Sequence, residues 1–163
     1  SLGADVPFFI AELPAAWATG IGDRLQKAIP LAGYSILIVN PGYSVSTPWV
    51  YENFALTVGQ NINNLQNLHD SECVIGRHDF SEKTIQPEEV MNDLEKVTIS
   101  HYPEIDLLKK RLIQWGASAA LMSGSGPTVF GMFKTDKAEE AAACAQDLKR
   151  KYPSTYLVEP LQS

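Results

Sequence analysis

The sequence is poor in several features that define large classes of protein. It contains only two cysteines, Cys73 and Cys144, which suggest no disulfide framework, and we expect both to stay reduced in the cytoplasm. No apolar stretch reaches the roughly 20 residues that a membrane-spanning helix needs. No segment resembles a secretory signal peptide. These absences argue against a disulfide-stapled fold and against a membrane partner.

Positive charge is also scarce. Thirteen lysines and arginines stand against nineteen acidic residues, which gives a net charge of −6. An extended nucleic-acid surface needs clustered basic side chains, so this balance argues against nucleic acid as a partner, although not against a pocket for one nucleotide. The 45% of hydrophobic residues is typical of a globular protein with a packed core. The length suits one domain, or one domain plus a piece of a neighbour.

Common phosphate-binding and zinc-binding patterns are missing. Neither G-x-x-x-x-G-K-S/T nor G-x-G-x-x-G occurs in the sequence. His69, Cys73 and His78 have the residue types of a zinc site, but no second cysteine pair completes the usual four ligands. We interpret this stretch as a solvated loop and predict no metal site built from side chains.

The first third of the chain predicts short elements. Residues 8–30 are predicted to be short extended pieces, because prolines and glycines interrupt them repeatedly. The apolar run 34–39 predicts a buried strand that stops at an Asn-Pro-Gly turn. Thr47 and Pro48 have the form of an N-cap followed by proline at the first helical position, which predicts a short helix through Tyr51.

The clearest patterns lie beyond a polar, asparagine-rich stretch at 57–83, to which we assign no element. Acids directly after Pro87 and Pro103 predict two helix starts, because the helix dipole favours negative charge there. The second of these helices carries one apolar stripe and ends at a glycine C-cap: Ile105, Leu108, Leu112, Trp115 and then Gly116. Two strands, a helix and a last strand are predicted at residues 118–123, 128–133, 136–152 and 155–158.

From residue 34 onward the predicted order is strand, helices, strand, strand, helix, strand. This order is the split β-α-β pattern of a ferredoxin-like layer. We therefore predict an α+β fold, with an antiparallel sheet and helices on one of its faces.

Asp5 is the first candidate for chemistry. It lies between small residues and Pro7, which favours an extended or turning backbone for Val6. A carboxylate held by such a backbone suits a general base. Taken by itself, the segment is better explained by an aspartate that caps or turns the chain.

The second candidate is the glycine-rich connection between the two predicted strands, residues 123–127 (SGSGP). Gly124 and Gly126 permit positive φ, so Gly124, Ser125 and Gly126 are typical of a hairpin turn. The absence of Cβ atoms also permits close backbone approach, so a hairpin turn and a supporting role at a phosphate site are compatible. The spacing does not match the G-x-S-x-G nucleophile motif.

Together these segments resemble the GHMP family of small-molecule kinases. The resemblance begins with residues 2–9 (LGADVPFF) and continues through nearly the whole chain in five further ordered motifs, at 20–23 (GIGD), 40–42 (NPG), 46–48 (STP), 92–95 (NDLE) and 123–127 (SGSGP). Each motif alone is weak, but their order along one chain is specific.

The resemblance implies phosphoryl transfer from ATP, with Mg²⁺, to a small-molecule hydroxyl. It implies Asp5 as the base and Gly124, Ser125 and Gly126 as supports of the phosphate-binding loop. It implies a substrate-side wall at Thr47, Pro48 and Tyr51, with the Tyr51 ring stacked on a cytosine of the acceptor. It also implies a bacterial cytoplasmic enzyme, or a plastid one in a plant. We assign no role to His101–Pro103 and expect Glu95 to serve helix structure.

The chain departs from the family at its beginning. The family's glycine/serine phosphate loop and its active-site lysine are expected before Ser1, and neither is present. We therefore expect a C-terminal portion of a kinase, inactive alone, with residues 1–30 as the tail of the N-terminal catalytic domain and 31–163 as the C-terminal domain. The missing N-terminal half would be its partner.

Two alternatives stay open from the sequence. The first is an acceptor of another branch of the family, as in homoserine, mevalonate or sugar kinases. The second is a ferredoxin-like ligand-binding module without catalysis, since many unrelated functions share that topology.

Overall fold

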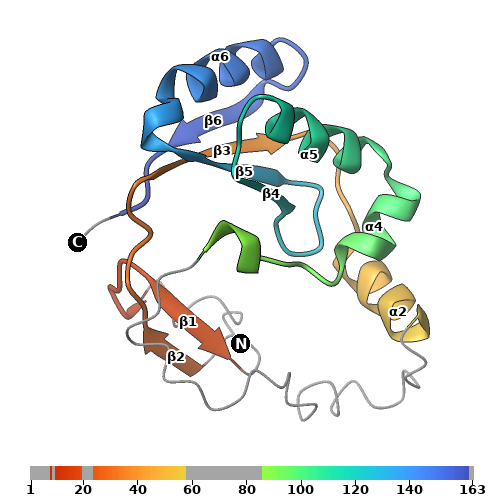
Figure 1. Ribbon diagram of the computed structural model, residues 1–163. Helices are drawn as coiled ribbons and strands as arrows, with labels where there is room; N and C mark the ends of the chain where they lie inside the picture. The colour runs from red at the N-terminus through yellow and green to blue at the C-terminus, as the bar shows by residue number, and fades with distance from the viewer. Residues whose placement is uncertain (1–7, 9, 20–23, 58–85, 162–163) are drawn as a thin grey trace. The chain divides into compact units, whose positions relative to one another are not determined.

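The computed structural model describes residues 8, 10–19, 24–57 and 86–161 (Figure 1). The described residues fall into two compact units. The first holds the described residues up to 32 together with 161, and the second holds 33–57 and 86–160. Asp5 and the stretch 58–85, which includes His69, Cys73 and His78, lie outside the described residues.

The first unit contains a β-hairpin. Strands β1 (Ala16–Thr19) and β2 (Arg24–Lys27) are antiparallel, with Ala16 opposite Lys27. The Ala28 N–H donates to the Ala15 carbonyl at 3.1 Å and extends the pairing by one residue. Short extended pieces were predicted here and are confirmed.

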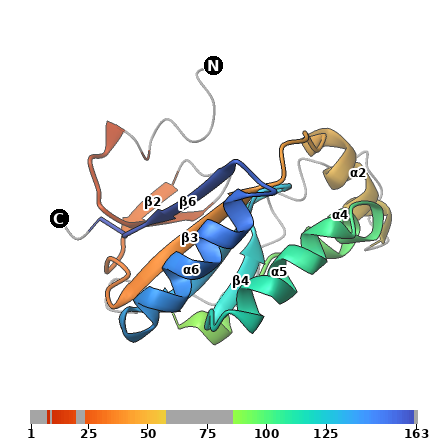
Figure 2. The same ribbon diagram turned by 90° about the horizontal axis from the view of Figure 1, so that it is seen from above.

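The second unit is built on a four-stranded antiparallel sheet in the order β4-β5-β3-β6. Its strands are β3 (Tyr34–Asn40), β4 (Ala119–Met122), β5 (Val129–Lys134) and β6 (Ser154–Val158). Helices α5 (Glu104–Gln114) and α6 (Ala138–Lys149) lie side by side over one face of the sheet (Figures 1 and 2). The predicted ferredoxin-like α+β arrangement is confirmed.

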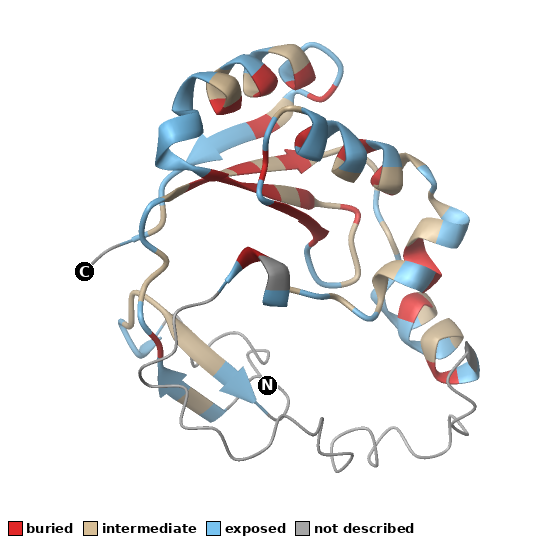
Figure 3. Ribbon diagram, in the orientation of Figure 1, coloured by how far each residue is buried: buried red, intermediate tan, exposed pale blue. Residues whose placement is uncertain are grey.

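Alternation along β3 explains which face the helices cover. Ser35, Leu37 and Val39 are buried, while the residues between them are only partly buried. Because successive side chains point to opposite faces of a strand, these three share the face under the helices. Figure 3 shows the buried positions gathered on the facing sides of strands and helices.

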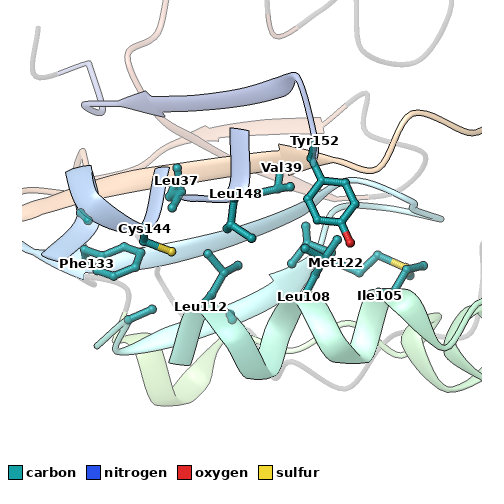
Figure 4. Close-up of a cluster of buried hydrophobic side chains, with 14 residues drawn as sticks. Leu37, Val39, Ile105, Leu108, Leu112, Met122, Phe133, Cys144, Leu148 and Tyr152 are labelled. Atoms are coloured by element: carbon teal, nitrogen blue, oxygen red, sulfur yellow. The ribbon is translucent and has the colours of Figure 1, made fainter. Parts of the chain in front are cut away.

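The core between sheet and helices joins side chains from distant parts of the chain. Leu37, Leu112 and Phe133 are fully buried there, and Leu148 of α6 meets them from the second helix (Figure 4). The predicted stripe of α5 supplies Ile105, Leu108 and Leu112 to this cluster, with Trp115 packed at its margin. Helix α5 is followed by Gly116 at φ +99°, a left-handed conformation that glycine adopts without strain.

The structure corrects the prediction of a helix after Pro87. Only one turn of 3₁₀ helix, η2 (Pro87–Glu89), forms there, because Val90 returns to extended backbone at φ −77° and ψ 128°. A separate helix, α4 (Glu95–His101), follows, and its start was not predicted. The final helix also differs slightly, since a 3₁₀ turn, η3 (Thr135–Lys137), precedes α6.

Helix α2 (Thr47–Thr57) begins where a helix was predicted and continues past Tyr51. The predicted cap is wrong by one residue. The Ser46 hydroxyl accepts the Trp49 N–H at 3.4 Å and the Ser46 carbonyl accepts the Val50 N–H at 3.0 Å, so Ser46 is the N-cap. The Thr47 hydroxyl is thereby left for another contact.

No helix in the described part of the chain has both the length and the apolar character to cross a bilayer.

Candidate functional site

The connection between β4 and β5 is a tight turn. The Gly126 N–H donates to the Ser123 carbonyl at 3.0 Å, and the Ser123 N–H donates to the Thr128 carbonyl at 2.8 Å. Gly124 has φ +56° and Gly126 has φ +86°. A Cβ added at Gly126 would lie 2.6 Å from the Met122 sulfur, so close packing also requires glycine there. The hairpin interpretation of Gly124, Ser125 and Gly126 is confirmed.

The side chain of Asn92 binds main-chain atoms at the start of this turn. Its Nδ2 donates to the carbonyls of Met122 and Gly124, both at 2.8 Å. Its Oδ1 accepts the Leu94 N–H at 3.0 Å, which fixes the orientation of the amide. Both donor hydrogens and the acceptor oxygen of the side chain are therefore used, and the amide ties the lead-in of α4 to the turn.

Glu95, at the start of α4, makes a second tie. One carboxylate oxygen accepts the Met122 N–H at 2.7 Å, and the other forms an ion pair with Lys109 of α5. The carboxylate is mostly buried, with 14% of the side chain exposed. Glu95 was expected to serve helix structure, and it lies in the first turn of α4, where it also joins that helix to α5 and β4.

Thr98 completes the support of the turn from α4. Its side chain is fully buried, and its hydroxyl lies 3.2 Å from the Leu94 carbonyl and 3.3 Å from the Ser125 carbonyl. Asn92, Glu95 and Thr98 together contact the main chain of Met122, the last residue of β4, and of two turn residues, Gly124 and Ser125. A backbone held at so many atoms has a defined shape, because hydrogen bonds are directional.

The turn meets α2 through two hydroxyl groups. The Thr47 Oγ1 and Ser125 Oγ lie 2.8 Å apart, a hydrogen bond between positions 78 residues apart in sequence. Tyr51 lies one helical turn beyond Thr47, on the same face of α2, because residues four apart are neighbours on a helix. The Tyr51 side chain is 44% exposed. The structure thus brings together the predicted wall and the predicted turn.

An aromatic cluster packs the first turn of α2 against the end of α4. The Trp49 ring centroid lies 4.9 Å from that of His101, and Tyr102 stacks on Tyr43 at 5.3 Å. No role was assigned to His101 or Tyr102 from the sequence. No local pattern in the sequence connects Tyr43, Trp49 and Tyr102, because Tyr102 lies more than 50 residues beyond the other two.

Charged groups gather at the start of α5, beside the aromatic cluster. The Glu104 carboxylate accepts the Tyr152 hydroxyl at 2.7 Å and the Lys151 ammonium at 2.9 Å. These hydrogen bonds, that of Tyr152 foremost, lower the pKa of Glu104. Burial, followed by the charge of Glu104, raises the pKa of Tyr43, whose buried hydroxyl makes no hydrogen bond to the described residues.

The chain is similar to one family of known proteins. The family described as GHMP kinases C terminal matches residues 82–153. A 4-diphosphocytidyl-2-C-methyl-D-erythritol kinase of Syntrophotalea carbinolica is 48% identical over 143 residues, which cover 87% of this chain and 46% of that protein. The protein of the same name from Geotalea daltonii is 47% identical over 152 residues, or 92% of this chain and 48% of that protein.

A solved structure agrees with these relatives. The crystal structure of a 4-(cytidine 5'-diphospho)-2C-methyl-D-erythritol kinase matches with a TM-score of 0.64 and 25% identity, covering 96% of this chain and 53% of that one. The chain belongs to the GHMP kinase family. It spans about half the length of the curated relatives it matches.

The structure describes some of the predicted site positions of this chain and not others. Thr47 and Pro48 form the exposed first turn of α2, and Tyr51 follows them. Their contact with a substrate stays a prediction, as does the role of Asp5, which lies outside the described residues. The sequence indicates Asn92 only as the first residue of the motif at 92–95, and its hydrogen bonds to Met122 and Gly124 were not predicted.

Metal binding finds little support among the described side chains. In residues 8, 10–19, 24–57 and 86–161, no group of three or more His, Cys, Asp and Glu side chains comes together as a metal site. Glu95, the acid at the turn, is already engaged by Lys109 and the Met122 N–H. The described part of this chain therefore does not offer a carboxylate cage for a cation.

Proposed function

We propose that the whole protein is a kinase that transfers the γ-phosphate of ATP to a hydroxyl of 4-diphosphocytidyl-2-C-methyl-D-erythritol, in non-mevalonate isoprenoid biosynthesis. The observation that carries the proposal is the identity of 47–48% with curated kinases of that name over 87–92% of this chain. The contact between Thr47 and Ser125 adds a structural reason, because it joins the two segments to which the resemblance assigns substrate and phosphate roles.

Asp5 is proposed as the base. Phosphoryl transfer demands positioning and charge stabilisation, with one group to take the acceptor's proton. The acceptor hydroxyl oxygen forms the new bond to phosphorus, the bond to the ADP oxygen breaks, and the hydroxyl proton passes to the Asp5 carboxylate. An aspartate is a weak base for an alcohol, so the proton moves late, as the new bond forms.

Two walls of the pocket are proposed from the second unit. The turn at Gly124, Ser125 and Gly126 supports the loop that binds the phosphates of ATP. Thr47 and Pro48 line the acceptor side, and the Tyr51 ring stacks on the cytosine, an interaction of about 1–3 kcal/mol where aromatic rings hold nucleic-acid bases. The exposure of Tyr51 and its place on the Thr47 face of α2 support this role.

The remaining proposals concern the protein as a whole. We propose that residues 1–30 end an N-terminal catalytic domain and that 31–163 form the C-terminal domain. The phosphate loop and lysine belong to the other half, so this chain alone is inactive. Mg²⁺ is proposed as the companion of ATP, and no step above passes through it. The enzyme would act in the bacterial cytoplasm, or in a plastid if the source is a plant.

The test is ADP release by the full-length gene product with 4-diphosphocytidyl-2-C-methyl-D-erythritol as the only acceptor. We expect acceptor-dependent release that Asp5→Asn lowers at least 100-fold while ATP binding persists. Asp93→Asn, an exposed acid in the second unit, is the matched control and should retain full activity. ATP binding without release would contradict this acceptor and turn attention to homoserine, mevalonate or sugar acceptors. A folded protein that binds no ATP would favour the non-catalytic module.

A further inference from the structure

The side chains that hold the turn at 123–127 all come from one short stretch, residues 92–98. Asn92 binds the carbonyls of Met122 and Gly124, and Glu95 binds the Met122 N–H. Thr98 reaches the Ser125 carbonyl. Every one of these bonds goes to the main chain of the turn or of Met122, the strand residue directly before it, so the hydroxyl of Ser125 is left for its contact with Thr47.

The hydroxyl pair is weak without this support. Thr47 is exposed and Ser125 is only partly buried, so water competes for both groups. A single neutral hydrogen bond stabilises the folded state by about 1 kcal/mol net. It contributes less where a flexible turn loses conformational entropy on forming the bond. The two hydroxyls can keep the 2.8 Å contact only if the turn is fixed beforehand. Asn92 and Glu95 fix the turn and the strand end before it through main-chain atoms that Thr47 does not touch.

The support is itself anchored in the core. Glu95 pairs with Lys109 on α5, the helix whose buried stripe packs on the sheet. Asn92 is oriented by the Leu94 N–H at the entry to α4. The position of Ser125 therefore follows the rigid sheet-and-helix layer, and through Thr47 so does the first turn of α2.

We propose that Asn92 and Glu95 are positioning residues for acceptor recognition. They hold Ser125 against Thr47 and so fix the wall that carries Thr47 and Tyr51. This inference rests on the proposed function for its catalytic consequence, but the positioning itself does not depend on activity. Neither residue touches the substrate: Asn92 acts through the Met122 and Gly124 carbonyls, and Glu95 acts through the Met122 N–H at the strand end that leads into the turn.

The first test measures positioning without catalysis. In the full-length gene product, Cys73→Ser, Cys144→Ala and serine at every cysteine outside residues 1–163 remove the native thiols. Thr47→Cys with Ser125→Cys then place one thiol on each side of the contact, and oxidised glutathione is the oxidant. Asn92→Ala is expected to slow disulfide formation between the new thiols about tenfold. Asp93→Asn, an exposed neighbour in the same stretch, is expected to leave the rate unchanged. An unchanged rate in Asn92→Ala, or equal slowing in Asp93→Asn, would overturn the proposal.

The second test uses steady-state kinetics on the same gene product. Asn92→Ala is expected to raise the acceptor KM about tenfold with kcat changed less than threefold. Thr47→Val should raise the acceptor KM at least as much, because it also removes the proposed acceptor contact, and the double variant should be no worse than Thr47→Val alone, because Asn92 acts through Thr47. Additive effects, or a fall in kcat at constant acceptor KM, would contradict the proposal.

Glu95 provides the conservative variant. Glu95→Gln keeps an oxygen for the Met122 N–H and should retain most acceptor affinity, whereas Glu95→Ala should behave as Asn92→Ala does. A protein that shows slowed cross-linking but releases no ADP from any acceptor would refute the proposed function and leave the positioning role intact. If Asn92→Ala does not fold, the Glu95 pair decides the question by the same two measurements.

Discussion

The second unit is held together in two different ways in two neighbouring regions. Between the sheet and helices α5 and α6, contact is almost wholly apolar, with Leu37, Leu112 and Phe133 fully buried. At the turn between β4 and β5, Ser123 and Gly124 are exposed, and the shape is held by hydrogen bonds from Asn92, Glu95 and Thr98.

The apolar core and the hydrogen-bonded turn contribute differently to the fold: the core contributes mainly stability, and the turn mainly a defined local geometry. Apolar burial is non-directional and grows with area, so the core supplies most of the free energy of folding and tolerates conservative repacking. Hydrogen bonds to a main chain are directional and individually small, so the turn gains a defined shape at little cost or benefit to stability. We expect substitutions in the core to change stability strongly and substitutions at the turn to change it less.

Leu112→Ala should give the largest loss. The side chain is fully buried between α5 and the sheet, where it contacts the Gly131 position of β5. Removing it should lower the free energy of unfolding by about 3 kcal/mol through lost burial and a cavity. Urea unfolding measures the loss. Leu107→Ala on the same helix is the control, because Leu107 is 65% exposed and should cost well under 1 kcal/mol. Equal losses would mean that the core interface is not formed as described.

Gly126→Ala should come second. Position 126 combines φ +86° with a Cβ site 2.6 Å from the buried Met122 sulfur, so strain and overpacking add to about 2 kcal/mol. Gly124→Ala is the matched comparison, since φ is +56° there but nothing lies within 4 Å of the Cβ site, and about 1 kcal/mol is expected. Denaturant unfolding of both variants separates backbone strain from contact. If the two cost the same, Met122 moves aside freely.

Thr98→Val should cost about 1 kcal/mol, because it removes the hydroxyl near the Leu94 and Ser125 carbonyls and keeps the volume of a fully buried side chain. Thr98→Ser keeps the hydroxyl and removes the methyl group that lies 3.5 Å from the Gly126 Cβ site. Thermal unfolding of the pair compares the polar and apolar halves of one side chain. A larger loss of stability in Thr98→Ser than in Thr98→Val would mean that apolar packing, as in the core, stabilises the turn region more than its hydrogen bonds do.

Glu104→Gln should have the smallest effect, and the effect should depend on pH. The pKa of Glu104 is lowered by the Tyr152 and Lys151 hydrogen bonds, so its ionised form stabilises the folded state. That contribution, about 1 kcal/mol or less for a partly exposed group, is present above the pKa of the unfolded chain near 4.3 and is lost as pH falls through the lower folded value.

Unfolding of wild type and Glu104→Gln from pH 7 to pH 3 should therefore show two stabilities that converge in acid. Glu139→Gln is the control, because Glu139 is an exposed acid in the first turn of α6 and shares only the dipole contribution. A difference that persists unchanged at pH 3 would assign the effect of Glu104 to packing.

The core region could be predicted from the sequence and the turn's supports could not. Ile105, Leu108 and Leu112 recur with the spacing of one helical face, so local periodicity was enough to place them in the core. The bonds of Asn92 connect residues 30 and 32 positions apart, and no local pattern reports a partner at that distance. The start of helix α4 was missed because its apolar residues, Val97 and Ile99, are too few for a periodic signal over seven residues.

The predicted N-cap shows the same limit on a smaller scale. Ser46 and Thr47 are adjacent and both suit an N-cap, and the pattern favoured Thr47 because proline follows it. The structure uses Ser46 as the cap, which places Thr47 inside the first turn and allows its hydroxyl to meet Ser125. That choice depends on the turn that approaches α2, which lies 78 residues away.

The sequence by itself determined the elements of the second unit, their order and the segments where chemistry was to be sought, because periodicity, glycine and proline act over a few residues. Tertiary structure alone decided that Asn92 and Glu95 would hold the turn and that Ser125 would meet Thr47. These contacts depend on the packing of the sheet and α5, because each joins groups whose separation along the chain far exceeds the reach of local preference.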